Sequence, residues 1–239
     1  MRFASKLPKT QVVDREAFIL SNCRGKKVLH LGCVDSGLLT ERLSSGRFLH
    51  AALATVSSEL WGLDVDLKGI ERLRHEGFER VHVGSAETMP ADIPRAYFDV
   101  VLAGELLEHV SNPGLLLESA AACCSPSGGL LLTTPNGLRF SNVISCLIST
   151  EMVHPDHTLA FTPATLQRLL KHHNLDATSL FLCQDSGELR IDNARTSWER
   201  LLRLAYNILL RPGLRILLIP FPYFADGLIV VAKRRSNSL

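Results

Sequence analysis

The 239-residue sequence lacks several features that would each point to a class of protein. Charges and prolines interrupt its apolar runs, so none approaches the ~20 residues that a membrane-spanning helix needs. Its six cysteines form no C-x-x-C pair and no zinc-ligand rhythm, which favours buried thiols in a reducing cytosol. The basic N-terminal segment has no apolar stretch of the kind found in signal peptides. We therefore expect a cytoplasmic protein.

The sequence also has little excess charge. Its 26 basic and 24 acidic side chains give a net charge of +2, which provides no electrostatic basis for general nucleic-acid binding. A hydrophobic content of 46% with 21% charged residues excludes disorder. No internal repeat or linker divides the chain, so a single domain over residues 1–239 is predicted.

Two short segments predict a nucleotide-binding α/β sheet. The segment KKVLHLGCVDSG has an apolar run for a buried strand, followed by a turn at Gly32-Cys33 small enough for a ligand to approach the backbone. A second apolar strand, Trp61 to Leu63, ends on Asp64. In open parallel sheets ligands bind at the carboxyl ends of adjacent strands, where an acid can hold a ribose diol. These segments predict an adenosine-containing cofactor.

The loop after the first strand lacks the second glycine of the dinucleotide fingerprint. Gly32, Val34 and Gly37 stand where G-x-G-x-x-G would bring a pyrophosphate against a helix. There is no phosphate-binding P-loop either. A cofactor without phosphates makes fewer demands on this loop, and S-adenosylmethionine is the obvious candidate. The alternative is an α/β domain with a tight turn and an incidental acid.

Further segments strengthen the cofactor hypothesis. The turn GSAE, the segment FDVVLAGELLEHV and the strand SPSGGLLLTTPN follow in order. With VLHLGC and GLDVD they resemble class I S-adenosylmethionine-dependent methyltransferases from about Lys26 to Leu175. The resemblance implies a Rossmann-like α/β fold, with a seven-stranded, mostly parallel sheet and helices on both faces. Its core would span about 14–184 plus 227–234, with strands in ATSLFLCQ and GLIVVAKR closing the sheet as an antiparallel pair.

The resemblance also implies cofactor contacts. Gly32 would lie against the methionine portion and Asp64 would bind both ribose hydroxyls. The turn after the third strand would flank the adenine, and the turn after the fourth would meet the amino-acid end. The residues in these two turns are Ala86 and Glu87, and Gly104 and Glu105, respectively.

The chain departs from the family pattern at two places. His30 stands where the family usually has an acid, and Val34-Asp35-Ser36 replaces a G-x-G. Asp35 is a candidate for supplying the missing carboxylate. If it does not, a non-catalytic scaffold protein that binds the cofactor is the alternative. The segment VLHLGCVDSG also resembles a variant found among methyltransferases associated with bacterial cell-surface glycan synthesis.

The segment GELLEHV carries a further candidate site. If it is helical, the i, i+3, i+4 spacing places its two glutamates and its histidine on one face. Together with HPDHTLAFTPATLQ it resembles the divalent-metal site of small-RNA 3′-terminal 2′-O-methyltransferases, and ubiquinone-pathway O-methyltransferases have a related arrangement. The ligands that this resemblance implies are Glu105, Glu108, His109 and His157. Alternatively, Glu105 meets the cofactor ammonium and His109 acts as a base or packs.

A hydroxyl acceptor needs a base or a metal to help remove its proton. His109 and His157 are the catalytic candidates, which favours O-methylation of a small-molecule, glycan or lipid-linked acceptor. A metal-dependent activity on RNA termini is an alternative, although the small net charge argues against a nucleic-acid partner.

The interval 185–226 is not required by the core fold. It is expected to be a helical insertion that covers the sheet edge or forms a lid or acceptor-binding element. Its basic residues beside aliphatic and aromatic ones also suit peripheral contact with the inner face of a membrane.

Overall fold

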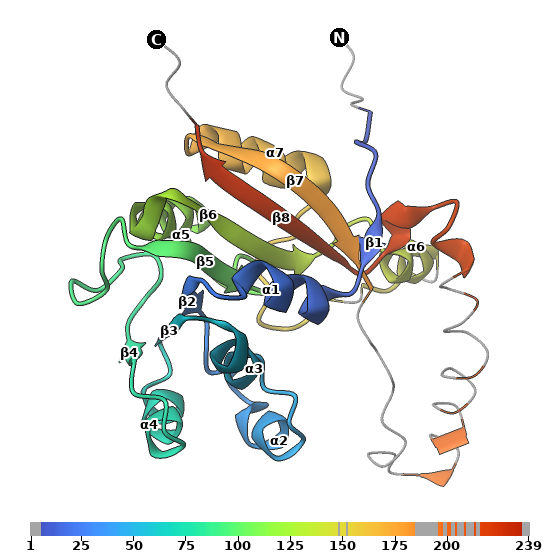
Figure 1. Cartoon of the computed structure of the whole chain (residues 1–239). Coiled ribbons are helices and arrows are strands. Elements are labelled where there is room, and N and C mark those ends of the chain that lie inside the picture. The colour runs from blue at the N-terminus through green and yellow to red at the C-terminus, as the bar shows by residue number, and fades with distance from the viewer. Residues whose placement is uncertain are drawn as a thin grey trace.

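The computed structural model describes residues 6–147, 149–151, 153–184, scattered positions between 196 and 217, and 218–235. Its centre is an eight-stranded sheet in the order β1-β7-β8-β6-β5-β2-β3-β4 (Figure 1). The strands are β1 (Val12–Val13), β2 (Lys27–Leu31), β3 (Glu59–Asp64), β4 (Val81–Val83), β5 (Phe98–Gly104), β6 (Cys124–Pro135), β7 (Leu175–Cys183) and β8 (Gly227–Arg234).

The sheet is parallel except at β8, which runs antiparallel to both β6 and β7. The predicted closing pair of strands is confirmed, and so is the Rossmann-like α/β class. The expected number of strands, seven, is one too few because β1 adds an edge strand. Strand β1 is only two residues long and pairs Val12 with Leu182, so its own sequence shows no alternation that would reveal it.

Helices cover both faces of the sheet. Along β2, Val28 packs in one buried cluster with Ile19 of α1 (Arg15–Cys23) and Leu53 of α3 (Leu49–Val56). Its neighbour Leu29 packs in another cluster with residues of α5 (Pro113–Cys123) and α7 (Pro163–His172), such as Leu166. Figure 1 shows α1 in front of the sheet and α7 behind β7. Successive side chains of a strand point to opposite faces, so these runs are apolar throughout.

Local signals define the helix starts. The side chain of Asp14 caps α1 by accepting a hydrogen bond from the Ala17 amide at 2.8 Å. Thr162 forms a capping box at α7, with Pro163 in the first turn. The segment between β2 and β3 forms two helices, because α2 (Leu39–Ser44) ends before Gly46 and α3 follows. The remaining described helices are α4 (Leu67–His75), α6 (Phe140–Leu147) and the short 3-10 helix η3 (Pro222–Phe224).

The segment GELLEHV does not meet the condition of being helical. Glu105 follows β5 with a φ of +50°, and the chain then turns, with the His109 amide donating to the Leu106 carbonyl at 3.1 Å. A left-handed φ is unfavourable within a right-handed helix. The i, i+3, i+4 argument from helical spacing is therefore wrong for this segment, although its side chains still converge in part.

Most of the interval 185–226 lies outside the described residues, so the lid, acceptor-element and membrane hypotheses stay predictions. Within the described parts of the chain, no helix combines the length and the apolar character needed to cross a membrane. Five of the six cysteines are buried and Cys146 is exposed.

A glycine in α4 compensates for the glycine missing from the loop after β2. Val34 is fully buried, and a Cβ placed on Gly69 would lie only 2.1 Å from its Cγ1 atom. The valine side chain therefore occupies the space that a side chain at position 69 would fill. The larger residue in the loop, Val34, is thus accommodated by a small residue, Gly69, in the helix that packs against it.

This packing predicts the effect of Gly69→Ala. In an open helix the change would add about 1 kcal/mol of stability through helix propensity. Here overpacking against Val34 should prevail and lower the free energy of unfolding by about 1–3 kcal/mol. Urea denaturation should also show that Val34→Ala/Gly69→Ala is more stable than the sum of the two single effects. A more stable Gly69→Ala protein would contradict this packing.

Candidate functional site

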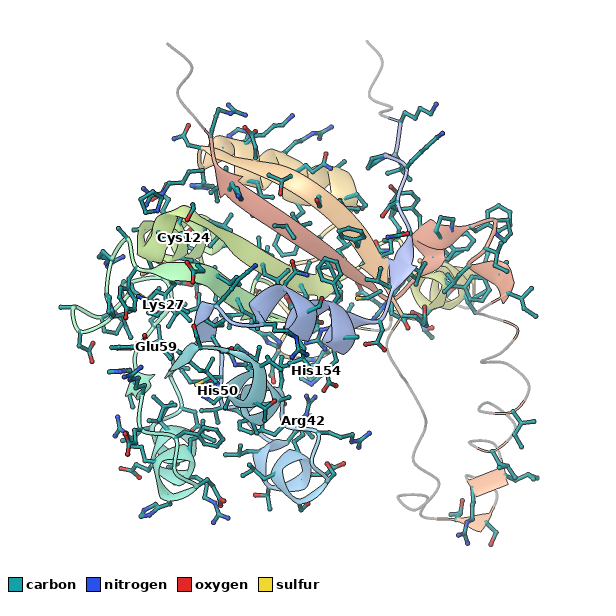
Figure 2. The ribbon with its side chains drawn as sticks, viewed as in Figure 1. Lys27, Arg42, His50, Glu59, Cys124 and His154 are labelled. Carbon is teal, nitrogen blue, oxygen red and sulfur yellow. The ribbon has the colours of Figure 1, made fainter. Side chains whose placement is uncertain are left out.

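The order of the strands places a cavity at the carboxyl ends of β2, β3 and β5. Strand β2 pairs with β3 on one side and β5 on the other, which is the reversal point where open parallel sheets bind ligands. A cavity of about 520 Å³ lies there. Arg42 and His154, both labelled in Figure 2, come from distant segments and both line it. The predicted site residues that line it are Gly32, Asp35, Asp64, Gly104, Glu105, His109 and His157.

Asp64 ties the ends of β2 and β3 together. Its Oδ2 atom accepts a hydrogen bond from the Val34 amide at 2.9 Å, and Oδ1 accepts from the Asp66 amide at 3.0 Å. Each carboxylate oxygen has a second lone pair, so both can still accept from a ligand hydroxyl. Gly32 has a φ of +70°, and a Cβ there would lie 3.3 Å from Leu106 Cδ1. The backbone therefore forms the floor of the cavity at this point.

Asp35 lies in the cavity wall as an ion-paired carboxylate. It has a φ of +60° and its Oδ2 atom lies 2.7 Å from Arg42 Nε. Burial raises the pKa of Asp35, while the Arg42 and Arg15 guanidinium groups oppose this shift. Asp35 thus brings a negative charge to the loop, as the sequence suggested, but Arg42 already balances it.

The two residues expected beside the adenine are not among those that line the cavity. Glu87 accepts a hydrogen bond from the Asn112 amide at 2.9 Å, and the Ala86 carbonyl accepts one from the Ser119 hydroxyl. These bonds hold the turn after β4 against α5 and its N-cap. The adenine role of Ala86 and Glu87 remains a prediction.

Arg15 is a cavity residue that the sequence did not reveal. Its Nε donates to Thr133 Oγ1 at 3.3 Å and lies 3.9 Å from Glu105 Oε1, while Thr133 Oγ1 donates to that same oxygen at 2.9 Å. Helix α1 precedes β2, and its first residue returns to the edge where the strands end. The Asp14 cap was the only local signal, because it places Arg15 at the first helical position.

Glu108, His109 and His157 form the core of the proposed metal site. One ligand atom from each lies within 4.8 Å of the others. Glu105 does not belong to this group, because its carboxylate accepts from Thr133 instead. Thr158 brings the two segments together, since its amide and hydroxyl donate to the Glu108 carbonyl at 2.9 and 3.2 Å. Three of the four ligands implied by the resemblance are therefore adjacent.

Glu108 has one unsatisfied oxygen. The residue is 1% exposed, and its Oε2 accepts from Thr134 Oγ1 at 2.9 Å. Among the described residues its Oε1 is buried without a hydrogen-bond partner. Burial, reinforced by the charge of Glu105, raises the pKa of Glu108 to about 7. Such an atom fits a position beside a cation, because an unsatisfied buried polar group is otherwise costly.

Three histidine rings meet at the mouth of the cavity. The ring centroids of His109 and His157 are 4.5 Å apart, and His154 lies 5.1 Å from His157. Burial lowers the pKa of His157, and the neighbouring His109, His154 and Arg139 act in the same direction. His157 is therefore available at neutral pH as a proton acceptor or a metal ligand.

A mostly parallel sheet with its cavity at the strand-order reversal defines a Rossmann-like nucleotide-cofactor fold. Residues 9–180 match the family model described as a methyltransferase domain, so the chain belongs to this family. More specifically, it is a member of the class I S-adenosylmethionine-dependent methyltransferases, as the motifs indicated.

Several relatives share this sequence pattern. The chain is 31% identical over 168 residues to a ubiquinone biosynthesis O-methyltransferase of Azoarcus sp.. This match covers 65% of this chain and 66% of that protein. A mitochondrial protein of the same name from Schizosaccharomyces pombe is 29% identical over 170 residues, covering 70% and 57%. The matches thus span less than two thirds of the length of these relatives.

Solved structures share the fold. A SAM-dependent methyltransferase from Archaeoglobus fulgidus superposes with a TM-score of 0.54 at 19% identity, covering 92% of this chain and 91% of that one. Magnesium protoporphyrin IX methyltransferase from Synechocystis PCC 6803, solved with bound SAH, gives 0.55 at 12% identity, covering 92% and 80%. At these identities the likeness concerns the fold alone.

The environment of Glu108 predicts how stability depends on pH. A carboxyl whose pKa is raised from 4.5 to about 7 retains its proton in the folded state where the unfolded chain has lost it. The free energy of unfolding therefore falls as pH rises through that window. Glu108→Gln stays neutral, so with a chelator present its stability relative to wild type should increase by about 3 kcal/mol between pH 4.5 and 8. Urea titrations that give parallel profiles would contradict this assignment.

Proposed function

We propose that this protein transfers the methyl group of S-adenosylmethionine to a hydroxyl oxygen of its acceptor. The observation that carries the proposal is the position of Glu108, His109 and His157, which adjoin the cavity that contains Asp64 and Gly32. Groups that can manage a hydroxyl proton thus lie beside a nucleotide-cofactor cavity. The relatives named as ubiquinone biosynthesis O-methyltransferases support oxygen as the methylated atom.

The reaction is an in-line displacement. With S-adenosylmethionine bound, the acceptor oxygen would form a bond to the methyl carbon while the carbon–sulfur bond breaks and its electron pair stays on sulfur, leaving S-adenosylhomocysteine. Holding the oxygen and the methyl group in line removes much of the entropic barrier. The hydroxyl proton passes to an imidazole, for which His157 is suited by its lowered pKa and His109 by its adjacent ring.

The cluster also fits a divalent metal ion. Glu108 supplies a buried oxygen without a partner, and His109 and His157 supply imidazole nitrogens within reach of it. Two nitrogen ligands and one carboxylate suit zinc, manganese or iron better than calcium. A bound ion would lower the pKa of a coordinated hydroxyl. In this proposal Glu105 serves the cofactor rather than the ion, because its carboxylate already contacts Thr133 and Arg15.

The acceptor is proposed to be a small molecule, glycan or lipid-linked compound that has an apolar part. Helix α6 begins just after Arg139, whose charge acts on His157. It exposes Val143, Ile144 and Leu147, the last being 77% exposed. Such a surface beside the cavity mouth suits an amphiphilic acceptor or contact with a membrane surface.

A non-catalytic scaffold that binds the cofactor is the competing function. The ion pair between Asp35 and Arg42 is the observation that favours it, since it uses the carboxylate expected to replace the missing acid. Turnover separates the two functions, because a scaffold binds S-adenosylmethionine without producing S-adenosylhomocysteine in the presence of any acceptor. A screen of phenolic, glycosyl and lipid-linked hydroxyl compounds with methyl-labelled cofactor provides this test.

Cofactor binding through Asp64 leads to a first prediction. A carboxylate that accepts from two ribose hydroxyls makes charge-assisted hydrogen bonds worth about 1.5–3 kcal/mol each. Asp64→Asn should therefore weaken binding of S-adenosylmethionine at least tenfold in calorimetry. Asp92→Asn is the matched control, because Asp92 pairs with His82 and does not line the cavity. Unchanged affinity in Asp64→Asn would refute the placement of the ribose.

A second prediction separates the acid–base and metal role from cofactor binding. His157→Ala should reduce turnover by about 10²-fold or more, the usual contribution of an acid–base group. Calorimetry should show cofactor affinity within twofold of wild type, because His157 lies at the acceptor end. A chelator should reproduce the loss, and added Zn²⁺ or Mn²⁺ should reverse it in wild type only. His172→Ala, on α7, is the control, and full activity of His157→Ala would exclude His157 from the chemistry.

A further inference from the structure

Two buried histidines form a pair beneath the cofactor cavity. His30 lies on β2 and His50 on α3, and they are 4% and 1% exposed. Their Nδ1 atoms are 3.1 Å apart, and their rings stack at 5.4 Å with an angle of 19°. At this separation one Nδ1 carries a hydrogen and the other accepts it. The hydrogen bond therefore orients both rings and makes the tautomer of one ring depend on that of the other.

The pair is uncharged at neutral pH. Burial lowers the pKa of His30 well below its ordinary value, and the neighbouring charges of His50 and Arg15 act in the same direction. Burial lowers the pKa of His50 to about 4. Cys33, three residues after His30, has a thiol whose pKa is raised by burial. Hydrogen bonding rather than charge thus determines what His30 offers to a ligand.

The two rings have different surroundings. His30 lines the cavity together with Gly32 and Arg15. His50 packs against aromatic rings, with Phe78 at 5.1 Å and Phe48 at 6.1 Å between centroids. This packing prevents His50 from turning. With Nδ1 engaged by His50, the ring nitrogen of His30 that remains for a ligand is Nε2.

The charges near His30 match the amino-acid end of the cofactor. Arg15, from α1, offers a guanidinium to a carboxylate, and Glu105, after β5, offers a carboxylate to an ammonium. Asp35 is balanced by Arg42, and Asp64 ends β3 on the other side of Gly32. A zwitterionic group that contacts both Arg15 and Glu105 lies in the cavity that His30 also lines.

We propose that His30 is a cofactor-contacting residue, and that His50 is its positioning residue, holding the His30 ring so that Nε2 makes a hydrogen bond to the amino-acid end of S-adenosylmethionine. This inference rests on the proposed cofactor. It explains why a histidine can stand on β2 where an acidic side chain was expected: a second imidazole from α3 orients it. S-adenosylhomocysteine has the same amino-acid end as S-adenosylmethionine, and the His30 ring is neutral. The hydrogen bond from His30 therefore contributes equally to the binding of cofactor and product.

Calorimetry with S-adenosylmethionine and S-adenosylhomocysteine tests the proposal on the full chain. His50→Leu should weaken the binding of both ligands at least fivefold, and by similar factors. His50→Asn, whose amide can donate to His30 Nδ1, should recover at least half of the lost binding free energy. His173→Asn is the matched control, because His173 bonds Glu118 between α7 and α5, away from the cavity, and both affinities should stay at wild-type values.

Nitrogen-15 spectra of histidine-labelled wild-type protein give a second readout that needs no variant. The Nε2 resonance of His30 should shift when either ligand is added, while that of His173 should not. Wild-type affinity in a folded His50→Leu protein, or an unshifted His30 resonance in the ligand-bound wild type, would overturn the proposal. Absence of S-adenosylmethionine binding by the wild type would instead overturn the proposed function itself. If His50→Leu does not fold, His50→Asn and the wild-type spectra decide.

Discussion

The site depends on the pairing of β2 with β3 on one side and β5 on the other. This arrangement brings the ends of three strands to one edge of the sheet, so that Gly32, Asp64 and Gly104 line one cavity. The Asp64 carboxylate then fixes the loop after β2 by accepting from the Val34 amide. The amides of Gly32 and Cys33 donate to the Leu63 carbonyl as well, so backbone and side-chain bonds together hold this loop against β3.

Much of the fold could be predicted from the sequence because buried parallel strands are continuous apolar runs. The apolar run around Val28 and the acid at Asp64 are local signals, and both belong to strands that the structure contains. Strand β1 and the turn at Glu105 were not predictable in the same way. The first depends on pairing with β7, and the second on a left-handed residue that sequence spacing does not reveal.

The candidate site was predictable only in part, because side chains from distant segments complete it. Arg15 enters from a helix that precedes the first core strand, and its contact with Thr133 is a tertiary one. The metal ligands inferred from the resemblance included Glu105, but its carboxylate accepts a hydrogen bond from Thr133 and does not join the group around Glu108. Short-range spacing can place Glu108 beside His109, whereas the arrival of His157 depends on the bonds that Thr158 makes to the Glu108 carbonyl.

The departures from the family pattern are compensated by neighbouring residues. Val34 fits because Gly69 leaves room for it, and His30 is oriented by His50. Both compensations come from helices that pack behind the cavity, α4 and α3. The loop can therefore differ from the usual glycine-rich sequence and still leave a ligand-sized space above Gly32.

A crystal structure of the protein with S-adenosylhomocysteine tests the central claim most directly. The account predicts that both ribose hydroxyls lie within about 3.2 Å of the Asp64 carboxylate. It also predicts that the amino-acid end contacts both Arg15 and Glu105, with the sulfur atom facing the side of the cavity where His109 and His157 meet. A ligand bound elsewhere, or one whose sulfur faces away from these histidines, would contradict the account.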